Sequence, residues 1–91
     1  MVTVLVPGPL RGEAGGASRL SVDAAGSVGA VLDALAAGWP RLARRIRDER
    51  GDLRRYVNVY VDGEDCRHLG GVDAPVADGA EVQVLPSVAG G

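Results

Sequence analysis

The sequence predicts an α+β domain in which a mixed sheet is covered on one face by one main helix. Three observations predict this fold. Alternating apolar residues recur near both ends of the chain and at 56–61, a pattern typical of strands. One segment in between repeats its apolar residues at helical spacing. The strands are grouped around this single long helix, an order that favours the α+β class.

The first strand is expected at residues 1–6, where apolar side chains occupy both alternating sets. Apolar residues on both faces favour a central position in the sheet. The Pro-Gly-Pro sequence at 7–9 ends this strand, and residues 12–16 are expected to form a loop. A second strand at 17–22 would complete a hairpin.

A helix is expected to begin after Ser27, because a serine hydroxyl group is a good N-cap. Gly38 suits its C-terminal end, and Pro40 suits the first position of a shorter second helix. The second helix continues the apolar stripe with Leu42 and Ile46. The apolar face of the first helix consists of Val28, Val31, Leu32, Leu35 and Trp39.

The clearest alternation in the chain, at 56–61, predicts another strand. An Asp-Gly turn follows it, and a short return strand is expected at 64–68. Residues 69–75 are expected to be irregular. The last strand is predicted at 81–85, where Pro86 would stop it.

A compact arrangement of these elements places the first and last strands side by side and parallel, with the helix in a right-handed crossover. That is the β-grasp arrangement. It predicts a β-grasp domain over residues 1–86 and a flexible C-terminal tail over residues 87–91. The tail would project from the end of a central strand.

Composition excludes several classes of function. The 91 residues carry a formal net charge of −2, which gives no drive toward nucleic acid or anionic membranes. No apolar run is long enough to span a bilayer, and the N-terminus is not expected to be a signal peptide. The single cysteine, Cys66, excludes an internal disulfide, and a reducing cytoplasm is the expected location.

The Gly90-Gly91 ending suggests chemistry at the C-terminal carboxyl group. This group is ionised at pH 7 and is a poor electrophile, so sulfur cannot replace its oxygen until that oxygen becomes a leaving group. Condensation with ATP to an acyl-adenylate would achieve this. Because the chain has no glycine-rich phosphate loop with lysine, we expect a separate enzyme to use ATP and this chain to bind no cofactor.

Two glycines let the end of the chain enter a narrow channel, but ordering five or six tail residues costs on the order of 5–10 kcal/mol. Pro86 lowers that cost by fixing one φ angle. Docking of the folded body must offset the rest, so we expect a partner-binding surface on the sheet face opposite the helix. Its expected contributors are Tyr60, Leu69, Val72 and Leu85 from the body and Ser87, Val88 and Ala89 from the tail.

Four segments carry a resemblance to a known family. They are Tyr56-Val57-Asn58-Val59-Tyr60-Val61-Asp62-Gly63-Glu64-Asp65, Gly70-Gly71, Ala77-Asp78-Gly79-Ala80-Glu81-Val82 and Leu85-Pro86-Ser87-Val88-Ala89-Gly90-Gly91. Together they resemble the prokaryotic ubiquitin-like sulfur carriers. That family includes the small subunit of molybdopterin synthase, the thiamine sulfur carrier and the carrier that feeds a cysteine synthase. The resemblance is strongest to the cysteine-synthase carrier.

The resemblance implies a sequence of partners. An ATP-dependent, E1-like activating enzyme would adenylate Gly91, and a sulfur donor (a rhodanese or a persulfide) would convert it to a thiocarboxylate. In the cysteine branch, the sulfur anion attacks an aminoacrylate on a pyridoxal-phosphate synthase, and a metalloprotease then releases cysteine. In the molybdenum branch, sulfur passes to a pterin precursor within a complex with a larger subunit.

Other candidate groups favour simpler interpretations. Cys66 could carry a persulfide, but a lone cysteine beside a turn is better explained as a bystander thiol. His68 has no second histidine or nearby cysteine with which to hold a metal. The acidic residues Asp62, Glu64 and Asp65 do not fit the spacing of a calcium loop, so no metal site is predicted.

Arginines are concentrated between residues 41 and 55, where three acidic residues interrupt them. A solvated helix with internal ion pairs is the simpler interpretation, and steering toward an acidic partner is the alternative. Two other function classes remain open: a protein modifier joined to target lysines through Gly91, and a plain interaction domain. An enzyme is the weakest option, since the sequence shows no acid–base or nucleophile constellation.

Overall fold

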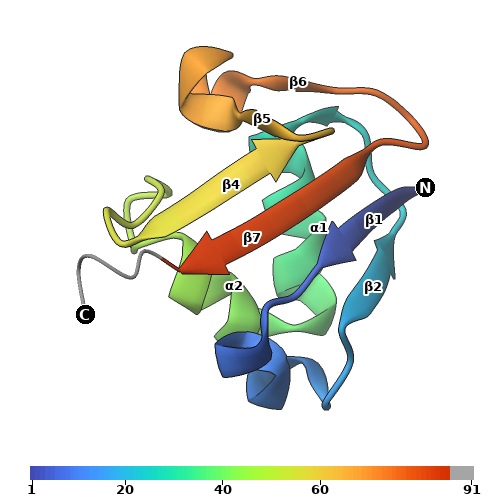
Figure 1. Ribbon diagram of the computed structural model, residues 1–91, viewed down its shortest axis with the longest axis vertical. Coiled ribbons are helices and arrows are strands. Elements are labelled where there is room, and N and C mark those ends of the chain that lie inside the picture. Colours follow the sequence, from blue (N-terminus) through green and yellow to red (C-terminus); the bar gives the residue numbers. More distant parts are fainter. Residues whose placement is uncertain (87–91) are drawn as a thin grey trace.

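The computed structural model describes residues 1–86 as a five-stranded mixed sheet with its helices on one face (Figure 1). The strand order in the sheet is β2-β1-β7-β4-β5. The sheet contains β1 (Val2–Leu5), β2 (Arg19–Val22), β4 (Val57–Val61), β5 (Glu64–Asp65) and β7 (Glu81–Pro86). The helices are α1 (Val28–Gly38) and α2 (Pro40–Ile46), and a second small sheet pairs β3 (Gly26–Ser27) with β6 (Pro75–Val76).

The last strand, β7, lies in the centre of the sheet. It pairs in parallel with β1, with Val4 opposite Val82, and antiparallel with β4, with Val59 opposite Val84. The predicted parallel pairing of the first and last strands is therefore confirmed, and so is the β-grasp fold. Because β7 has a neighbour on both sides, two ladders of hydrogen bonds hold it as far as Gln83, and the ladder with β4 continues to Pro86.

The core lies between the sheet and the helices. One alternating set of strand residues is fully covered, since Val4, Val59 and Val82 each have 0% exposure. Leu32 and Ile46 are equally buried on the helix side. Burying each such side chain stabilises the fold by about 1.5–3 kcal/mol. The other alternating set faces away from the helices and forms what we call the open face.

The helix boundaries follow the predicted signals. The Ser27 hydroxyl group accepts a hydrogen bond from the Ala30 amide at 3.1 Å, so Ser27 is the N-cap of α1. Helix α1 ends at Gly38 and α2 begins at Pro40, as predicted. Trp39 lies between the two helices, and its ring lies 3.2 Å from where a Cβ on Gly15 would stand.

The predicted loop at 12–16 was wrong in part. A 3₁₀ helix, η1 (Gly8–Ala14), occupies the first half of this connection. A proline at its start supplies the fixed φ angle that suits a helical first turn. It ends at Gly15, which has a φ of 63° and donates its amide to the Arg11 carbonyl.

The return strand predicted at 64–68 is shorter than expected. Strand β5 ends at Asp65, and a 3₁₀ turn, η2 (Cys66–His68), follows. The Asp65 carboxylate accepts a hydrogen bond from the Arg67 amide at 2.9 Å, and this cap turns the chain out of the strand.

The segment 69–75, expected to be irregular, contains a further 3₁₀ turn, η3 (Gly71–Asp73), and leads into β6. A two-residue strand such as β6 carries no periodicity to detect. Strand β7 also extends one residue further than predicted, through Pro86. Its pairing with β1 ends at Gln83, so Pro86 lies on a local edge, where proline is tolerated.

The Ser27 cap can be tested by Ser27→Ala. We expect the free energy of unfolding to fall by about 1 kcal/mol, because the Ala30 amide loses its acceptor. Urea denaturation followed by circular dichroism measures the change. Ser21→Ala on the exposed side of β2 is the matched control and should shift the free energy by less than about 0.5 kcal/mol. Equal losses in both variants would refute the cap.

Candidate functional site

The candidate site is built around the end of β7. Gln83 is the last residue of β7 that pairs with β1, whereas pairing with β4 continues to Pro86 opposite Val57. The sheet therefore places Pro86 beside the start of β4. The predicted tail residues Ser87, Val88, Ala89, Gly90 and Gly91 lie outside the described residues.

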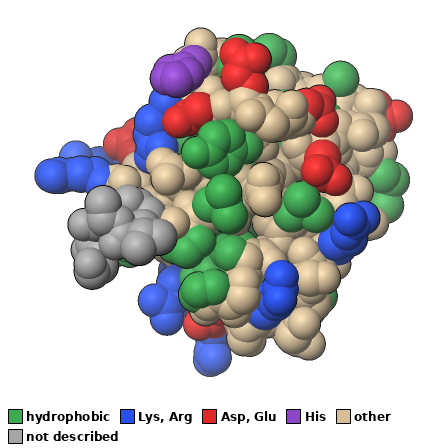
Figure 2. Space-filling view, in the orientation of Figure 1, with side chains coloured by type: hydrophobic (Ala, Val, Ile, Leu, Met, Phe, Trp, Pro, Cys, Tyr) green, Lys and Arg blue, Asp and Glu red, His purple; other side chains and the backbone are tan. Residues whose placement is uncertain are grey.

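The open face carries an apolar patch close to this point. Tyr60 and Leu85 lie on neighbouring strands as diagonal neighbours, because Tyr60 pairs with Gln83 and Leu85 pairs with Asn58. Leu85 is 37% exposed, which is unusual for a leucine in a central strand. Figure 2 shows hydrophobic side chains gathered over the middle of this face, with charged groups around them.

A groove of about 450 Å³ extends this patch across the sheet between β1, η1, β2 and β7. We call it the β1–β7 groove. Leu5, Arg19 and Leu85 line it from the open face, and Pro7 also lines it. Sequence reasoning missed Leu5, Pro7 and Arg19 as site residues. The signal for Leu5 was present, since it belongs to the outward alternating set of a strand with apolar residues on both faces.

The structure places the other two expected contributors elsewhere. Leu69 is half-buried and packs against the hydrophobic core. Val72 lies in η3 beside the first turn of α1, where its carbonyl oxygen is 3.2 Å from the position that a Cβ on Gly29 would take. Helix α1 covers the opposite face of the sheet. Tyr60 and Leu85 thus lie together, and Leu69 and Val72 do not lie with them.

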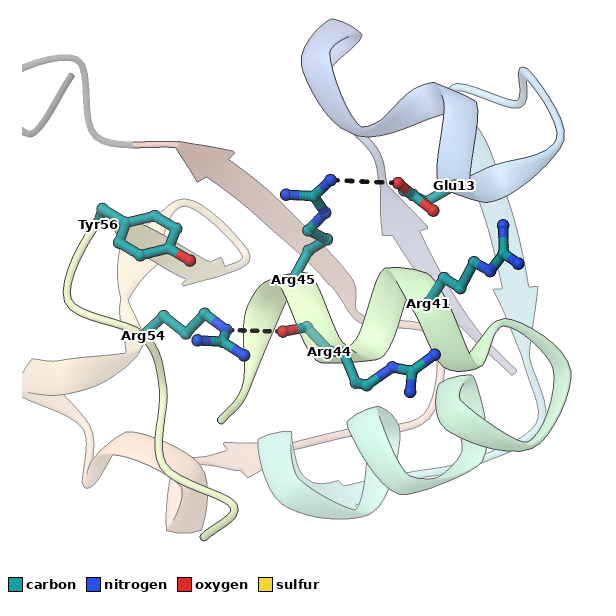
Figure 3. A pocket seen from close by; sticks show the side chains of 6 residues that line it. All are labelled: Glu13, Arg41, Arg44, Arg45, Arg54 and Tyr56. Carbon is teal, nitrogen blue, oxygen red and sulfur yellow. Dashed lines mark hydrogen bonds and ion pairs between the residues drawn. The ribbon is translucent and has the colours of Figure 1, made fainter. Parts of the chain in front are cut away.

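A second depression, of about 360 Å³, lies near the start of β4 (Figure 3). We call it the arginine pocket. It is lined by Glu13 from η1, by Arg41, Arg44 and Arg45 from α2, and by Arg54 and Tyr56 from the segment that leads into β4. The sequence drew attention to the arginines, but nothing in it indicated that α2 and the 54–56 segment meet.

Hydrogen bonds to backbone carbonyls hold the arginine pocket in shape. The Arg54 side chain donates through Nε to the Arg44 carbonyl at 2.6 Å, and its amide donates to the Ile46 carbonyl at 3.0 Å. Arg67 reaches the same segment, donating to the Val57 carbonyl at 2.8 Å and the Arg54 carbonyl at 3.2 Å. The two Arg54 bonds tie the 54–57 segment to α2, and the Arg67 bonds tie it to η2.

Comparison with known proteins decides the family. The model of the ThiS family matches residues 4–91. The chain belongs to the ThiS family. The predicted membership among ubiquitin-like sulfur carriers is thereby confirmed.

Relatives within the family are similar over nearly their whole length. The sulfur carrier protein CysO of Mycobacterium tuberculosis is 44% identical over 93 residues, which cover 99% of this chain and 98% of the relative. Its crystal structure matches with a TM-score of 0.89 at 39% identity, over 97% of this chain and 100% of that chain. CysO in the BexX/CysO complex of Amycolatopsis orientalis matches with a TM-score of 0.86 at 38% identity, over 100% of both chains.

A relative with a different description is also similar. The small archaeal modifier protein 3 of Haloferax volcanii is 40% identical over 70 residues, which cover 77% of this chain and 75% of that protein. CysO of Mycobacterium tuberculosis therefore matches a larger share of the chain than this modifier does.

Cys66 lies apart from both surface depressions. Its side chain has 0% exposure and lies in the hydrophobic core. Burial raises the pKa of the Cys66 thiol, so the group stays protonated near neutral pH and is a poor nucleophile. Among residues 1–86, no group of three histidine, cysteine or carboxylate side chains could hold a metal ion. No helix in this part of the chain is long and apolar enough to cross a membrane.

The burial of Cys66 predicts slow alkylation. At pH 8, iodoacetamide should modify the native chain at least about 100-fold more slowly than the chain in 6 M guanidinium, because reaction requires local opening. Intact-protein mass spectrometry over time measures both rates. Rapid modification of the native chain would contradict the buried, protonated thiol and would reopen a persulfide role for Cys66.

Proposed function

We propose that this chain is a sulfur carrier whose Gly91 carboxyl group is converted to a thiocarboxylate and donates sulfur to a biosynthetic enzyme. The observation that carries this proposal is the 44% identity to a sulfur carrier protein over nearly the full length. The central position of β7 supports it, because a rigid strand leads directly into the reacting end.

The chemistry requires two steps on partner proteins. In the first step, the Gly91 carboxylate attacks the α-phosphorus of ATP, which forms the acyl-adenylate and releases pyrophosphate. In the second step, hydrosulfide attacks the activated carbonyl and displaces AMP, leaving the thiocarboxylate. When the sulfur comes from a rhodanese persulfide, an acyl disulfide forms first, and a thiol reductant releases the thiocarboxylate from it. The carrier supplies only the carboxylate and its placement.

The acceptor that we propose is a pyridoxal-phosphate cysteine synthase. A thiocarboxylate sulfur is a soft anion that adds to the β-carbon of an aminoacrylate held on that enzyme. The Gly91 acyl group then moves from the sulfur of the cysteine to its amino group, which leaves cysteine joined to Gly91 by a peptide bond. A metalloprotease would release the cysteine by hydrolysis. The similarity to CysO proteins supports this branch over molybdopterin synthesis.

The apolar part of the open face fits the role of a docking surface. Leu85 precedes Pro86 at the end of β7, and Tyr60 lies beside it. A partner that covers this patch would bury apolar surface and gain about 25 cal/mol per Å². That gain would offset the conformational entropy that is lost when the tail enters a partner's channel.

Protein modification is a second candidate function. The 40% identity to a small archaeal modifier protein favours it. The same adenylate at Gly91 would then acylate a lysine amine on a target protein. Because every basic side chain in this chain is arginine, the chain offers no lysine for conjugation to a second copy of itself. Isopeptide-linked conjugates in cells that express a tagged chain would support this function.

Sulfur loading can be tested by intact-protein mass spectrometry. After incubation with ATP, a sulfur donor and the activating enzyme, the chain should gain about 16 Da as one oxygen is replaced by sulfur. Deletion of Gly90 and Gly91 should abolish the gain, whereas Cys66→Ala should retain it. A gain that survives the deletion, or one that depends on Cys66, would contradict the proposal.

The docking role of the open face predicts a specific kinetic effect. Leu85→Gln should raise the KM of the activating enzyme for the carrier by about tenfold and should leave unfolding nearly unchanged, since Leu85 is already 37% exposed. Ser21→Gln, on the same face but at the β2 edge, is the matched control and should have little effect. Steady-state loading rates measure both. Equal KM values for the two variants would argue against this surface.

A further inference from the structure

The arginine pocket holds more positive charge than the carboxylate beside it can balance. Four guanidinium groups line it and only one carboxylate, Glu13, does so, in a chain whose net charge is −2. Glu13 lies 3.5 Å from Arg45, at the long end of ion-pair distances. Among residues 1–86, neither Arg41 nor Arg44 has a carboxylate within ion-pair distance, and both are exposed.

The fold holds these like charges together through the backbone. Arg44 and Arg45 lie in the last turn of α2, where the negative end of the helix dipole favours cations. The bond from Arg54 Nε to the Arg44 carbonyl ties a fourth guanidinium group to the same end. Figure 3 shows Arg41, Arg44 and Arg45 extending from α2 and Arg54 approaching from the facing segment.

A neighbouring depression gives a useful contrast. It is lined by Arg50, Arg54 and Arg55, but also by Asp48 and Glu49, so its charges are nearly balanced. The arginine pocket therefore differs from its neighbour in charge balance. Positive charge is concentrated where α2 meets the start of β4.

The arginine pocket borders the point where β7 ends. Tyr56 lines the pocket and is followed by Val57, which pairs with Pro86. Five residues follow Pro86, and a fully extended chain of that length spans at most about 18 Å. A protein that binds Gly91 in its active site must therefore lie close to this part of the surface.

We propose that the arginine pocket binds an acidic surface segment of the activating enzyme, which receives the tail. This inference rests on the proposed carrier function and adds the chemistry of the partner's second contact. Guanidinium groups bind carboxylates through two parallel hydrogen bonds, and the Tyr56 hydroxyl group offers a further donor. A partner segment held nearby by the tail docks at high effective concentration, an advantage that free phosphate lacks.

The test compares two double variants with the same change in charge. Arg41→Gln/Arg44→Gln removes two charges from the arginine pocket, and Arg50→Gln/Arg55→Gln removes two from the balanced depression. Surface plasmon resonance would measure association with the activating enzyme of the same genome, without ATP, at several salt concentrations. A hexaglutamate peptide and inorganic phosphate are added as competitors, and circular dichroism checks that each variant folds.

We expect the pocket variant to associate about tenfold more slowly at low salt, and the difference to shrink as ionic strength rises. The control should stay within about twofold of the wild type. Hexaglutamate should slow the wild type but not the pocket variant.

Equal association rates for the two variants would overturn the proposal. Competition by inorganic phosphate without competition by hexaglutamate would overturn it as well. Sulfur loading at saturating enzyme should be unchanged in the Arg50→Gln/Arg55→Gln control. Failure of the wild type to load sulfur would instead contradict the proposed function. The association rates, measured without ATP, do not test that function.

Discussion

The parallel pairing of β1 with β7 is the interaction on which the rest of the structure depends. It brings the first and last strands of the described chain together in the centre of the sheet, with Val4 opposite Val82, and it leaves β4 to complete the other side of β7. The crossover between β1 and β7 contains both helices, so α1 and α2 must cover one face of the sheet. The other face stays open, and the strand that leads to Gly91 runs through its middle.

Two chemically different surfaces meet at the end of β7. The apolar patch around Leu85 lies on the open face, and the arginine pocket lies around the start of β4. Apolar contact supplies free energy, whereas charge supplies orientation and speed of association. A carrier that serves several enzymes in turn needs rapid, reversible docking more than tight binding. The combination suits a protein whose reacting group is placed by its body and activated by its partners.

Most of the fold could be predicted from local signals, because each long element carries its own period and its own terminal residues. Ser27 and Pro40 marked both helix starts, and the alternation at 56–61 marked β4. The short elements were missed because a two-residue strand such as β6 has no period to detect, and η1 has no side-chain N-cap to mark its start. The arginine pocket was missed because the Arg54 side chain reaches the Arg44 carbonyl through a hydrogen bond that forms in the folded chain between residues of two separate segments.

We expect the activating enzyme to recognise the folded body, and not the tail alone. The most direct measurement compares kcat/KM for sulfur loading of the full chain with that of a synthetic peptide of residues 81–91. We predict a value at least about 100-fold lower for the peptide, because it lacks both docking surfaces and must lose more conformational entropy. Values within about threefold of each other would contradict the account.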